Sequence, residues 1–405
     1  MAIFQKYCKI TKFFNSKIQK FLNIFIFMRI MDIAWFTDTW LPTKDGVVTS
    51  LLSFKKVLEK KGCKIYVFAP GDEDKKENEI FYQKSRPFCN YPDYRISSFS
   101  SIFSRKILKF IKEKKPIIHS HSPGIIGTSA VVSSYKFKIP LIFTYHTFVE
   151  DSVYLLFKSK KLQKIAKKLF YIWLRWYLKK CSCIIAPSPY ALNRIKKFLK
   201  NDVDLEIIPT GVDIERFKYG DGKEIRKKYG NKKIILHVGR IVKEKNIEIL
   251  IESAPYILRK LDAIFLIVGK GPAKKDLIKK IKNKGLEKYF VFTGFVKDEE
   301  LPNYYKSADV FVFPSIYETQ GLVAFEAMAA GLPVVASRAK ALPDFIKDGY
   351  NGYLFSPSDA KEMADKILMA IGNKEIIKNA EEFVKEYDIN RMAQKLFEVY
   401  KKYEN

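Results

Sequence analysis

The sequence predicts an α/β protein with parallel β-sheets, and the clearest evidence lies near residue 320. Residues 310–313 are an apolar run typical of a buried strand, and residues 322–330 are rich in good helix formers. Gly331 and Pro333 end that helix, and residues 334–337 indicate another strand. The order strand, loop, helix, strand is typical of a parallel sheet. Since a chain of 405 residues exceeds one comfortable core, we expect two domains.

The same alternation runs through the rest of the chain. Residues 30–36 indicate a first strand, and a helix that ends at Lys60 follows it. Later strands are expected at residues 64–69, 117–119, 141–145, 184–186, 234–238 and 264–268, with a last strand after Gly352. The polar stretch at residues 202–206 is expected to link the two domains.

The formal net charge of +29 at pH 7 is the unusual feature of the composition. It indicates an anionic partner, namely nucleic acid, anionic lipid or a phosphorylated substrate, unless it reflects bulk composition alone. Five scattered cysteines argue for reduced thiols in a cytoplasm rather than a disulfide framework. Residues 1–27 are basic, and their apolar part is too short to cross a membrane. They are either a segment that lies on a membrane surface or an extension that precedes a true start at Met28.

One glutamate lies within a predicted phosphate-binding loop and a second lies shortly after it. Residues 317–321 open a helix, where free backbone N–H groups and the helix dipole favour an anion such as phosphate. Glu318 and Glu326 would repel a phosphate that they faced, but carboxylates are good hydrogen-bond acceptors for hydroxyl groups. A ligand that carries both a diphosphate and many hydroxyls is a nucleotide sugar. The alternative is an ordinary amphipathic helix with solvated glutamates.

Cations follow the predicted strand at residues 234–238. Gly239 and Arg240 come directly after it, and Lys245 follows five residues after Arg240. Because Arg and Lys neutralise the charge on leaving phosphates, this pattern predicts a diphosphate site, with plain surface charge as the alternative. In the first domain, Gly46 stands where a loop becomes a helix. A glycine there allows a ligand to approach the backbone, unless it serves only the turn.

Three of the four histidines follow strands of the first predicted sheet. His119, His121 and His146 lie at two strand ends, whereas His237 lies within a later strand. Ligands of parallel α/β sheets bind at the carboxyl ends of the strands, so the first three are candidates for the site. The alternative is that they are buried core residues.

The stretch PSIYETQGLVAFEAMAAGLPVVAS at residues 314–337 resembles the retaining glycosyltransferases of family 4 (group 1), which have the GT-B fold. Residues 37–50, TDTWLPTKDGVVTS, resemble the branch of that family that includes diacylglycerol glucosyltransferases. The resemblance covers nearly everything from Met28 onward. It implies two Rossmann-like parallel-sheet domains that face a central cleft. Residues 28–204 would bind the acceptor and residues 205–386 the nucleotide sugar, and a final helix at residues 387–405 would return to the first domain.

The resemblance also implies roles for individual residues. Four residues are expected to carry the reaction: Arg240 and Lys245 on the leaving diphosphate, and Glu318 and His121 on the transferred sugar. The expected contacts of the donor, which is of the UDP-glucose or GDP-mannose type, are Gly46, Gly239, Arg240, Lys245, Gly294, Glu318, Gln320, Gly321, Leu322 and Glu326. Glu326 would hold the ribose hydroxyls, and Gly294 lies in the loop near the base. No metal and no obligatory cofactor are expected, because a phosphate oxygen can take the proton of the acceptor.

Residues 155–180 combine nine cations with six aromatic residues and contain no acid. On a helix, this composition gives a cationic face and an aromatic face, which suits an anionic membrane surface or single-stranded nucleic acid. The alternative is a helix that packs its aromatic residues on the sheet and solvates its lysines. Together with the resemblance, this segment predicts a cytoplasmic enzyme, peripheral on the inner face of the cell membrane, that glycosylates a lipid such as diacylglycerol. A soluble or phosphorylated sugar acceptor, a sugar-nucleotide epimerase and a nucleic-acid-binding protein are the alternatives.

Overall fold

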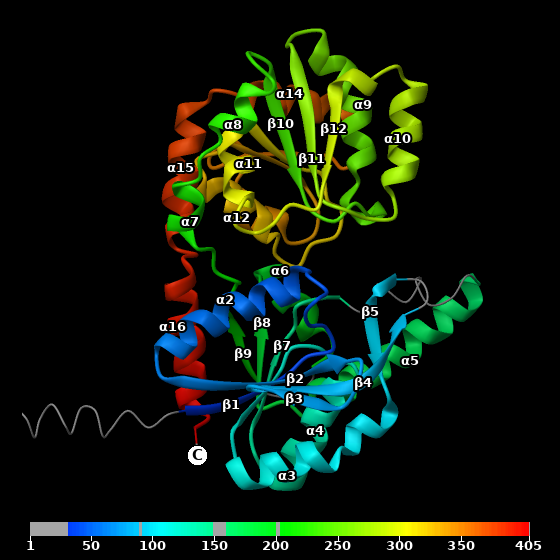
Figure 1. Cartoon of the computed structure of the whole chain (residues 1–405), viewed down its shortest axis with the longest axis vertical. Coiled ribbons are helices and arrows are strands. Elements are labelled where there is room, and N and C mark those ends of the chain that lie inside the picture. The colour runs from blue at the N-terminus through cyan, green and yellow to red at the C-terminus, as the bar shows by residue number, and fades with distance from the viewer. Residues whose placement is uncertain (1–30, 89–90, 149–158, 200–202, 405) are drawn as a thin grey trace, which may run out of the picture.

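The chain folds into two lobes, each built on its own sheet (Figure 1). The computed structural model describes residues 31–88, 91–148, 159–199 and 203–404. Residues 1–27 and Phe157 lie outside the described residues, so the two interpretations of the basic N-terminal segment stay predictions. The predicted α/β class with two parallel-dominated sheets is confirmed.

Nine strands form the first sheet within the described residues, in the order β3-β4-β2-β1-β6-β7-β8-β9, with β5 paired to β4. Only β3 and β5 among these run antiparallel to their neighbour. Their bounds are β1 (Met31–Phe36), β2 (Cys63–Gly71), β3 (Lys75–Glu77), β4 (Ile80–Phe88), β5 (Tyr91–Ser97), β6 (Ile117–Ser120), β7 (Leu141–Thr144), β8 (Cys183–Ala186) and β9 (Asp204–Ile207). Strands β6, β7 and β8 are buried along their whole length, as expected for strands covered on both faces.

Helices cover both faces of this sheet. One face carries α3 (Arg105–Lys114), α4 (Ile125–Phe137), α5 (Lys160–Leu178) and α6 (Pro189–Lys196), which pack through residues such as Ile111, Ala130 and Ile195. The other face carries α2 (Gly46–Lys60) and α16 (Ile389–Lys402), which pack through Phe54 and Leu396. The last helix of the chain therefore belongs to the core of the first lobe.

Six parallel strands form the second sheet in residues 203–404, which are described without a gap, in the order β12-β11-β10-β13-β14-β15. Their bounds are β10 (Lys233–Val238), β11 (Ala263–Val268), β12 (Phe290–Gly294), β13 (Val310–Phe313), β14 (Val334–Ser337) and β15 (Tyr353–Phe355). One face packs against α7 (Ile214–Lys218), α8 (Lys223–Lys227), α11 (Leu301–Ser307), α12 (Leu322–Ala329), α13 (Leu342–Phe345) and α15 (Lys374–Lys385). The other face packs against α9 (Ile247–Leu258), α10 (Lys274–Asn283) and α14 (Ala360–Ala370).

The chain crosses between the lobes at two places that lie side by side. Strand β9 pairs in parallel with β8, so the chain leaves the first sheet only after Ile207, whereas the sequence predicted a link at residues 202–206. On its way back, the chain passes Val212, whose N–H donates to Tyr387 O at 2.9 Å and whose carbonyl accepts from Ile389 N at 3.0 Å. A Cβ on Gly211 would lie 2.4 Å from the Ile389 Cα, so only glycine fits there.

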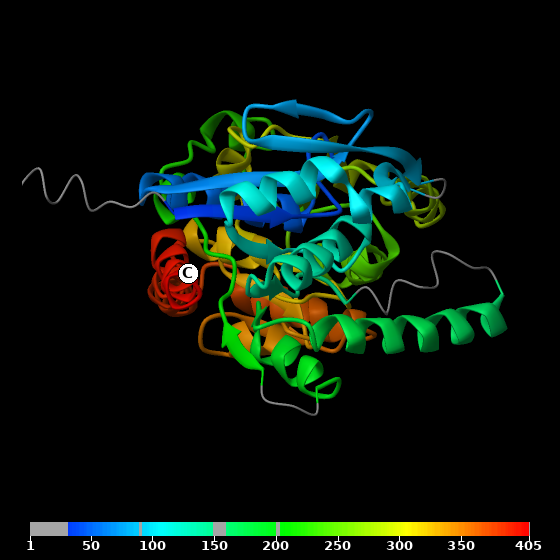
Figure 2. The same cartoon turned by 90° about the horizontal axis from the view of Figure 1, so that it is seen from below.

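Helix α5 projects from the body of the first lobe, as both views show (Figures 1 and 2). Its aromatic residues mostly do not form the free face that the sequence predicted: Tyr177 is buried, and Phe170, Tyr171 and Trp173 pack partly against the core. The exposed side is largely aliphatic instead. We call it the α5 stripe, and it consists of Leu162, Ile165, Leu169, Ile172 and Trp176, which are between 41% and 62% exposed.

The spacing of the α5 stripe explains why it forms one surface. Its members follow one another at intervals of three and four residues, which places them on the same side of a helix. Exposed lysines flank the stripe at Lys160, Lys161, Lys164 and Lys168. No helix in the part of the chain that the structure describes combines the length and apolar character of a membrane span.

Candidate active site

The loop before α12 brings the second lobe onto the first. Gly321 precedes the helix with a φ of +96°, and an added Cβ would lie 2.8 Å from both Leu342 Cδ2 and Phe313 Cε1. The Thr319 hydroxyl donates to His146 O at 2.7 Å, and the Tyr317 hydroxyl donates to Phe148 O. The N-terminus of α12, which begins at Leu322, is thus placed near the boundary between the lobes, where its free N–H groups favour an anion.

Gln320 connects this loop by hydrogen bonds to the stretch after β9, where the chain crosses from the first lobe to the second. Its side-chain amide donates to Thr210 O and its carbonyl accepts from Thr210 N, both at 2.7 Å. The Thr210 hydroxyl in turn donates to the Ser50 hydroxyl of α2 at 2.8 Å. The side chain of Gln320 is therefore used structurally, which leaves its backbone for the donor contact that the sequence predicted.

Lys245 and Glu318 form an ion pair. Lys245 ends a short 3₁₀ turn (Lys243–Lys245) after β10, and its ammonium also lies 5.3 Å from the centre of the Phe313 ring. Both side chains are largely shielded from solvent, at 21% and 13% exposure. The sequence predicted that Lys245 contacts phosphate and Glu318 contacts sugar. In the structure the two side chains contact each other, so a bound donor would have to replace this ion pair.

Arg240 reaches across to the first lobe. Its guanidinium donates to the Tyr94 hydroxyl and lies 5.3 Å from the centre of that ring. The Tyr94 hydroxyl donates to Asp45 at 3.1 Å, and Asp45 caps α2 by accepting from Val47 N and Val48 N. Gly46 lies in the same first turn, where an added Cβ would meet nothing within 4 Å. Packing of the chain therefore gives no reason for a glycine at this position.

Glu326 lies buried on α12, where it accepts a hydrogen bond from the Tyr305 hydroxyl at 2.7 Å. Burial raises the pKa of Glu326 to about 7, against the opposing effects of the Tyr305 hydrogen bond and the nearby charge of Arg216. The carboxyl group is therefore divided between its two protonation states near neutral pH.

The three histidines of the first lobe differ in their bonding. His119 has partners for both ring nitrogens, the Tyr400 hydroxyl at 2.6 Å and the Thr144 hydroxyl at 2.8 Å, so it is a core residue. His121 Nδ1 lies 3.1 Å from His146 Nε2, and His121 Nε2 is buried without a hydrogen-bond partner among the described residues. Burial lowers the pKa of His121, and lowers that of His146 to about 4. Both rings are neutral at pH 7, so His121 offers an uncharged nitrogen to a ligand.

Asp38 holds the loop that carries His121. Its half-buried carboxylate accepts hydrogen bonds from Gly124 N at 3.0 Å, Ile126 N at 2.8 Å and the Ser122 hydroxyl at 2.8 Å. Asp38 thus occupies the N-terminus of α4 with a side chain, and that helix end is not free for a phosphate.

The glycines at the ends of β10 and β12 have unusual backbone geometry. Gly239 has a φ of +151° and Gly294 a φ of +78°, and Gly294 O accepts from Gly269 N at 2.9 Å. Phe295, next to Gly294, is 57% exposed, and the ammonium of Lys270 lies 5.8 Å from the centre of its ring. Among the described residues, no group of three or more His, Cys, Asp or Glu side chains is arranged to hold a metal.

Asp45, Tyr94, Tyr305 and Asp38 are functional candidates to which sequence reasoning gave no role. Asp45 had a usable signal, because an aspartate just before a helix is a common cap. Asp38 had none, since it reaches the N-terminus of α4 only through the tertiary fold. Tyr94 and Tyr305 had none, since they meet Arg240 and Glu326 only through the tertiary fold.

Two family models match this chain, and several named proteins are similar to it over much of their length. A model described as glycosyl transferases group 1 matches residues 221–387, and one described as glycosyltransferase family 4 matches residues 44–216. The chain is 33% identical over 356 residues to the alpha-monoglucosyldiacylglycerol synthase of Streptococcus pneumoniae, which covers 84% of this chain and 78% of the relative. The protein of the same name from Acholeplasma laidlawii is 32% identical over 377 residues, or 88% and 93% of the two chains.

Solved structures resemble the fold as a whole. Anabaena HepE in complex with UDP and glucose superposes with a TM-score of 0.73 at 20% sequence identity, over 92% of this chain and 100% of that one. A sucrose-phosphate synthase from Thermosynechococcus elongatus superposes with a TM-score of 0.72 at 21% identity, over 92% and 98%.

Proposed function

This chain belongs to the group 1 glycosyltransferases of family 4, and we propose that it moves a hexosyl group from a nucleotide sugar to a membrane lipid such as diacylglycerol, with retention at the anomeric carbon. It is a hexosyltransferase with the GT-B fold. The observation that carries the proposal is the arrangement at the boundary between the lobes, where Arg240 and Lys245 lie with the loop that opens α12.

In this mechanism, the bond between the anomeric carbon and the diphosphate breaks as the acceptor oxygen bonds to that carbon. Negative charge develops on the leaving diphosphate, and preorganised cations and backbone N–H groups stabilise it. Arg240, Lys245 and the N–H groups at the start of α12 supply this stabilisation. The proton of the acceptor hydroxyl passes to a phosphate oxygen of the leaving group, so the step needs no strong base from the protein.

Donor binding then requires an exchange of partners. The diphosphate takes Arg240 from Tyr94, because a doubly charged phosphate chain is a stronger partner for a cation than a neutral hydroxyl. It also takes Lys245 from Glu318, whose carboxylate carries a single charge. Glu318, once free, accepts hydrogen bonds from the hydroxyls of the sugar. Glu326 accepts from the ribose, and the neutral His121 contacts the transferred sugar. The open space at Gly46 supports an approach of the phosphates to the α2 backbone.

Donor affinity is expected to rise about tenfold between pH 6 and pH 8 if Glu326 holds the ribose. The reason is its pKa of about 7: ribose hydroxyls bind the ionised carboxylate, and the ionised fraction increases as the pH passes through 7. His146, with a pKa of about 4, does not titrate in this range. The measurement is the dissociation constant of the nucleoside diphosphate across that range. The Glu326→Gln variant should bind more weakly with a flatter profile, and an equally steep profile in the variant would contradict the assignment.

The membrane acceptor is supported by the α5 stripe and by the named relatives. The α5 stripe is an exposed apolar surface flanked by exposed lysines. Helices with this pattern lie in the interface of an anionic membrane. The relatives from Streptococcus pneumoniae and Acholeplasma laidlawii are named as synthases of a glucosylated diacylglycerol. An anionic membrane surface is therefore the occupant that we propose for the α5 stripe.

The test is an assay with vesicles that contain diacylglycerol in an anionic or a neutral background, with UDP-glucose or GDP-mannose as donor. We expect sedimentation with the anionic vesicles, nucleotide release that depends on diacylglycerol, and a glycolipid product with an α-anomeric proton. Turnover only on sugar acceptors in free solution, without vesicle binding, would support a glycosyltransferase and contradict the membrane acceptor. Conversion of the donor to another sugar nucleotide without an acceptor would instead indicate an epimerase.

A further inference from the structure

Tyr400 of α16 carries a buried hydroxyl group to the centre of the first lobe. The indole Nε1 of Trp35 on β1 donates to this hydroxyl at 2.9 Å, and His119 Nδ1 on β6 lies 2.6 Å from it. All three side chains are fully buried. One hydroxyl group thus joins the last helix of the chain to two neighbouring strands of the first sheet.

The two rings that bond to Tyr400 also pack against His121. The ring centre of His121 lies 4.0 Å from that of His119 and 4.9 Å from that of Trp35. His121 Nδ1 lies 3.1 Å from His146 Nε2, whereas His121 Nε2 has no hydrogen-bond partner among the described residues. Because one ring nitrogen alone is bonded, the orientation of the His121 ring depends on the packing of its neighbours.

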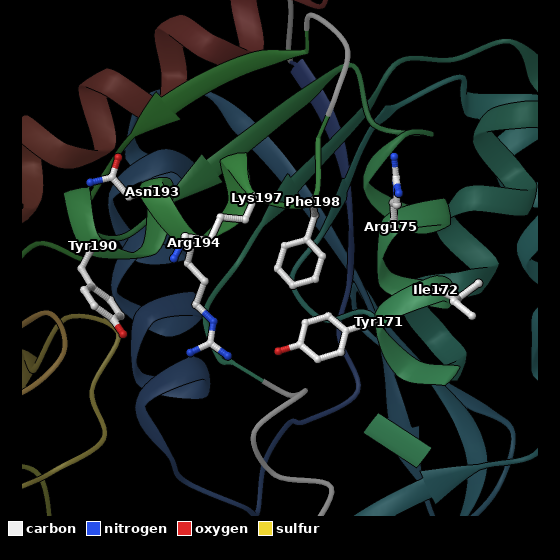
Figure 3. A pocket seen from close by; sticks show the side chains of 8 residues that line it. All are labelled: Tyr171, Ile172, Arg175, Tyr190, Asn193, Arg194, Lys197 and Phe198. Carbon is white, nitrogen blue, oxygen red and sulfur yellow. The ribbon is translucent and has the colours of Figure 1, made fainter. Parts of the chain in front are cut away.

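This cluster lies on the face of the first sheet that α16 covers. A pocket of about 510 Å³ between α5 and α6 lies on the other face, and none of the residues that line it belongs to the cluster (Figure 3). The contacts of Trp35 and His119 with His121 are therefore set from the side of α16 and not from the side of that pocket.

The hydrogen bonds of Tyr400 also determine which nitrogen of His119 carries the proton. An indole N–H can only donate, so the Tyr400 oxygen accepts from Trp35. The hydroxyl hydrogen of a buried tyrosine needs an acceptor, and the partner in place among the described residues is His119 Nδ1. Burial lowers the pKa of His119, so the ring is neutral at pH 7 and holds one proton. That proton is then on Nε2 and points to the Thr144 hydroxyl at 2.8 Å.

We propose that Tyr400 is a positioning residue for hexosyl transfer, whose hydroxyl fixes the rings of Trp35 and His119 so that they hold His121 in the orientation that meets the transferred sugar. The proposal rests on the proposed function, because it requires that His121 contacts the sugar. Tyr400 acts through these rings and does not touch the substrate, since it is fully buried. A small misplacement of a group that contacts the reacting sugar lowers the rate even when the misplaced group is still present.

The kinetic test compares Tyr400→Phe with Tyr403→Phe. Tyr403 ends the same helix, and its hydroxyl bonds to Ser182 O at 3.2 Å and to Asp204, far from the histidines in sequence. We expect kcat of transfer to fall about tenfold in Tyr400→Phe and to stay within about twofold of wild type in the control. Binding of UDP and GDP should be unchanged in both variants, because neither hydroxyl belongs to the donor contacts. Equal changes of kcat in the two variants would overturn the proposal.

Ring nitrogen spectra give a measurement that a general loss of stability does not reproduce. The chain has four histidines, so long-range ¹H–¹⁵N correlation spectra of protein labelled at histidine contain few signals. His119 should be protonated on Nε2 in the wild type and in Tyr403→Phe. In Tyr400→Phe it should become a mixture of both tautomers, and the His121 signals should shift. A wild-type His119 with its proton on Nδ1 would overturn the proposal even if the variant did not fold.

The failure of this proposal can be distinguished from the failure of the proposed function. Transfer to diacylglycerol by the wild type, with full kcat in Tyr400→Phe, would support the function and contradict the role of Tyr400. Transfer to another acceptor would contradict diacylglycerol as the acceptor, and the lower kcat of Tyr400→Phe on that acceptor would still support the positioning role. Full transfer by His121→Ala would contradict the sugar contact of His121, and with it the role of Tyr400, while the glycosyltransferase activity would stand.

Discussion

Replacement of Lys245 by alanine is expected to lower the rate of hexosyl transfer by about 10²–10³-fold, which is the usual effect of removing one preorganised group from a developing negative charge. Lys245 stands at the end of the turn after β10, partly shielded from solvent, and its only ion-pair partner in the described structure is Glu318. The loss should appear in the turnover number more than in donor affinity, because the charge on the diphosphate grows as the bond to the sugar breaks. Steady-state kinetics with purified variant and circular dichroism of its fold give the measurement.

The matched control for this prediction is Lys243→Ala. Lys243 belongs to the same short turn, has the same charge and is exposed. It should retain nearly full activity. If Lys245→Ala kept full transfer activity, or if both variants lost it equally, the assignment of Lys245 to the diphosphate would be wrong.

Reversal of three charges on α5, with Lys164, Lys167 and Lys168 changed to glutamate, should reduce partition onto anionic vesicles by at least about 100-fold. Each basic residue near an anionic surface contributes on the order of 1 kcal/mol, and the three new carboxylates add repulsion. The effect should shrink as salt rises, since the attraction acts within a Debye length of the surface. Co-sedimentation at several salt concentrations gives the measurement.

A control must distinguish the effect of the position of these three lysines from the effect of the protein's net charge. Lys275, Lys279 and Lys282 lie exposed on α10 of the second lobe, and their change to glutamate alters the net charge by the same amount. Vesicle binding should be almost unaffected in that control. Unchanged vesicle binding in the α5 variant, or equal losses of binding in both variants, would show that α5 is not the helix that contacts the membrane.

Local patterns allowed the sequence to predict the two sheets and the unit around α12. Strand and helix periods are set by neighbours in the chain, so the predicted strands at residues 310–313 and 334–337 match β13 and β14. The link was misplaced because β9 is an edge strand whose residues are mostly exposed, and an exposed edge shows no apolar pattern. Its polar residues therefore resembled a loop.

Pairings between distant residues were beyond prediction. Tyr94 meets Arg240 across 146 positions of sequence, and nothing near either residue indicates the other. Helix α5 shows the same limit. Its sequence identified basic and aromatic residues, but which of them are exposed depends on the side of the helix that faces the core, so that Tyr177 is buried and Leu169 is exposed. The roles of Glu318, Glu326 and His121 on a bound donor stay predictions that the experiments above address.

The paired crossings also constrain how the lobes move. Because Val212 is hydrogen-bonded to Tyr387 and Ile389, the two connections form one short two-stranded hinge rather than two independent tethers. Two hydrogen-bonded connections at one place restrain sliding of one lobe against the other more than two separate tethers would. These contacts favour one position of the loop of Tyr317 and Thr319 against the first lobe, and a chain cut before Asp388 would lose one of the two connections that maintain it.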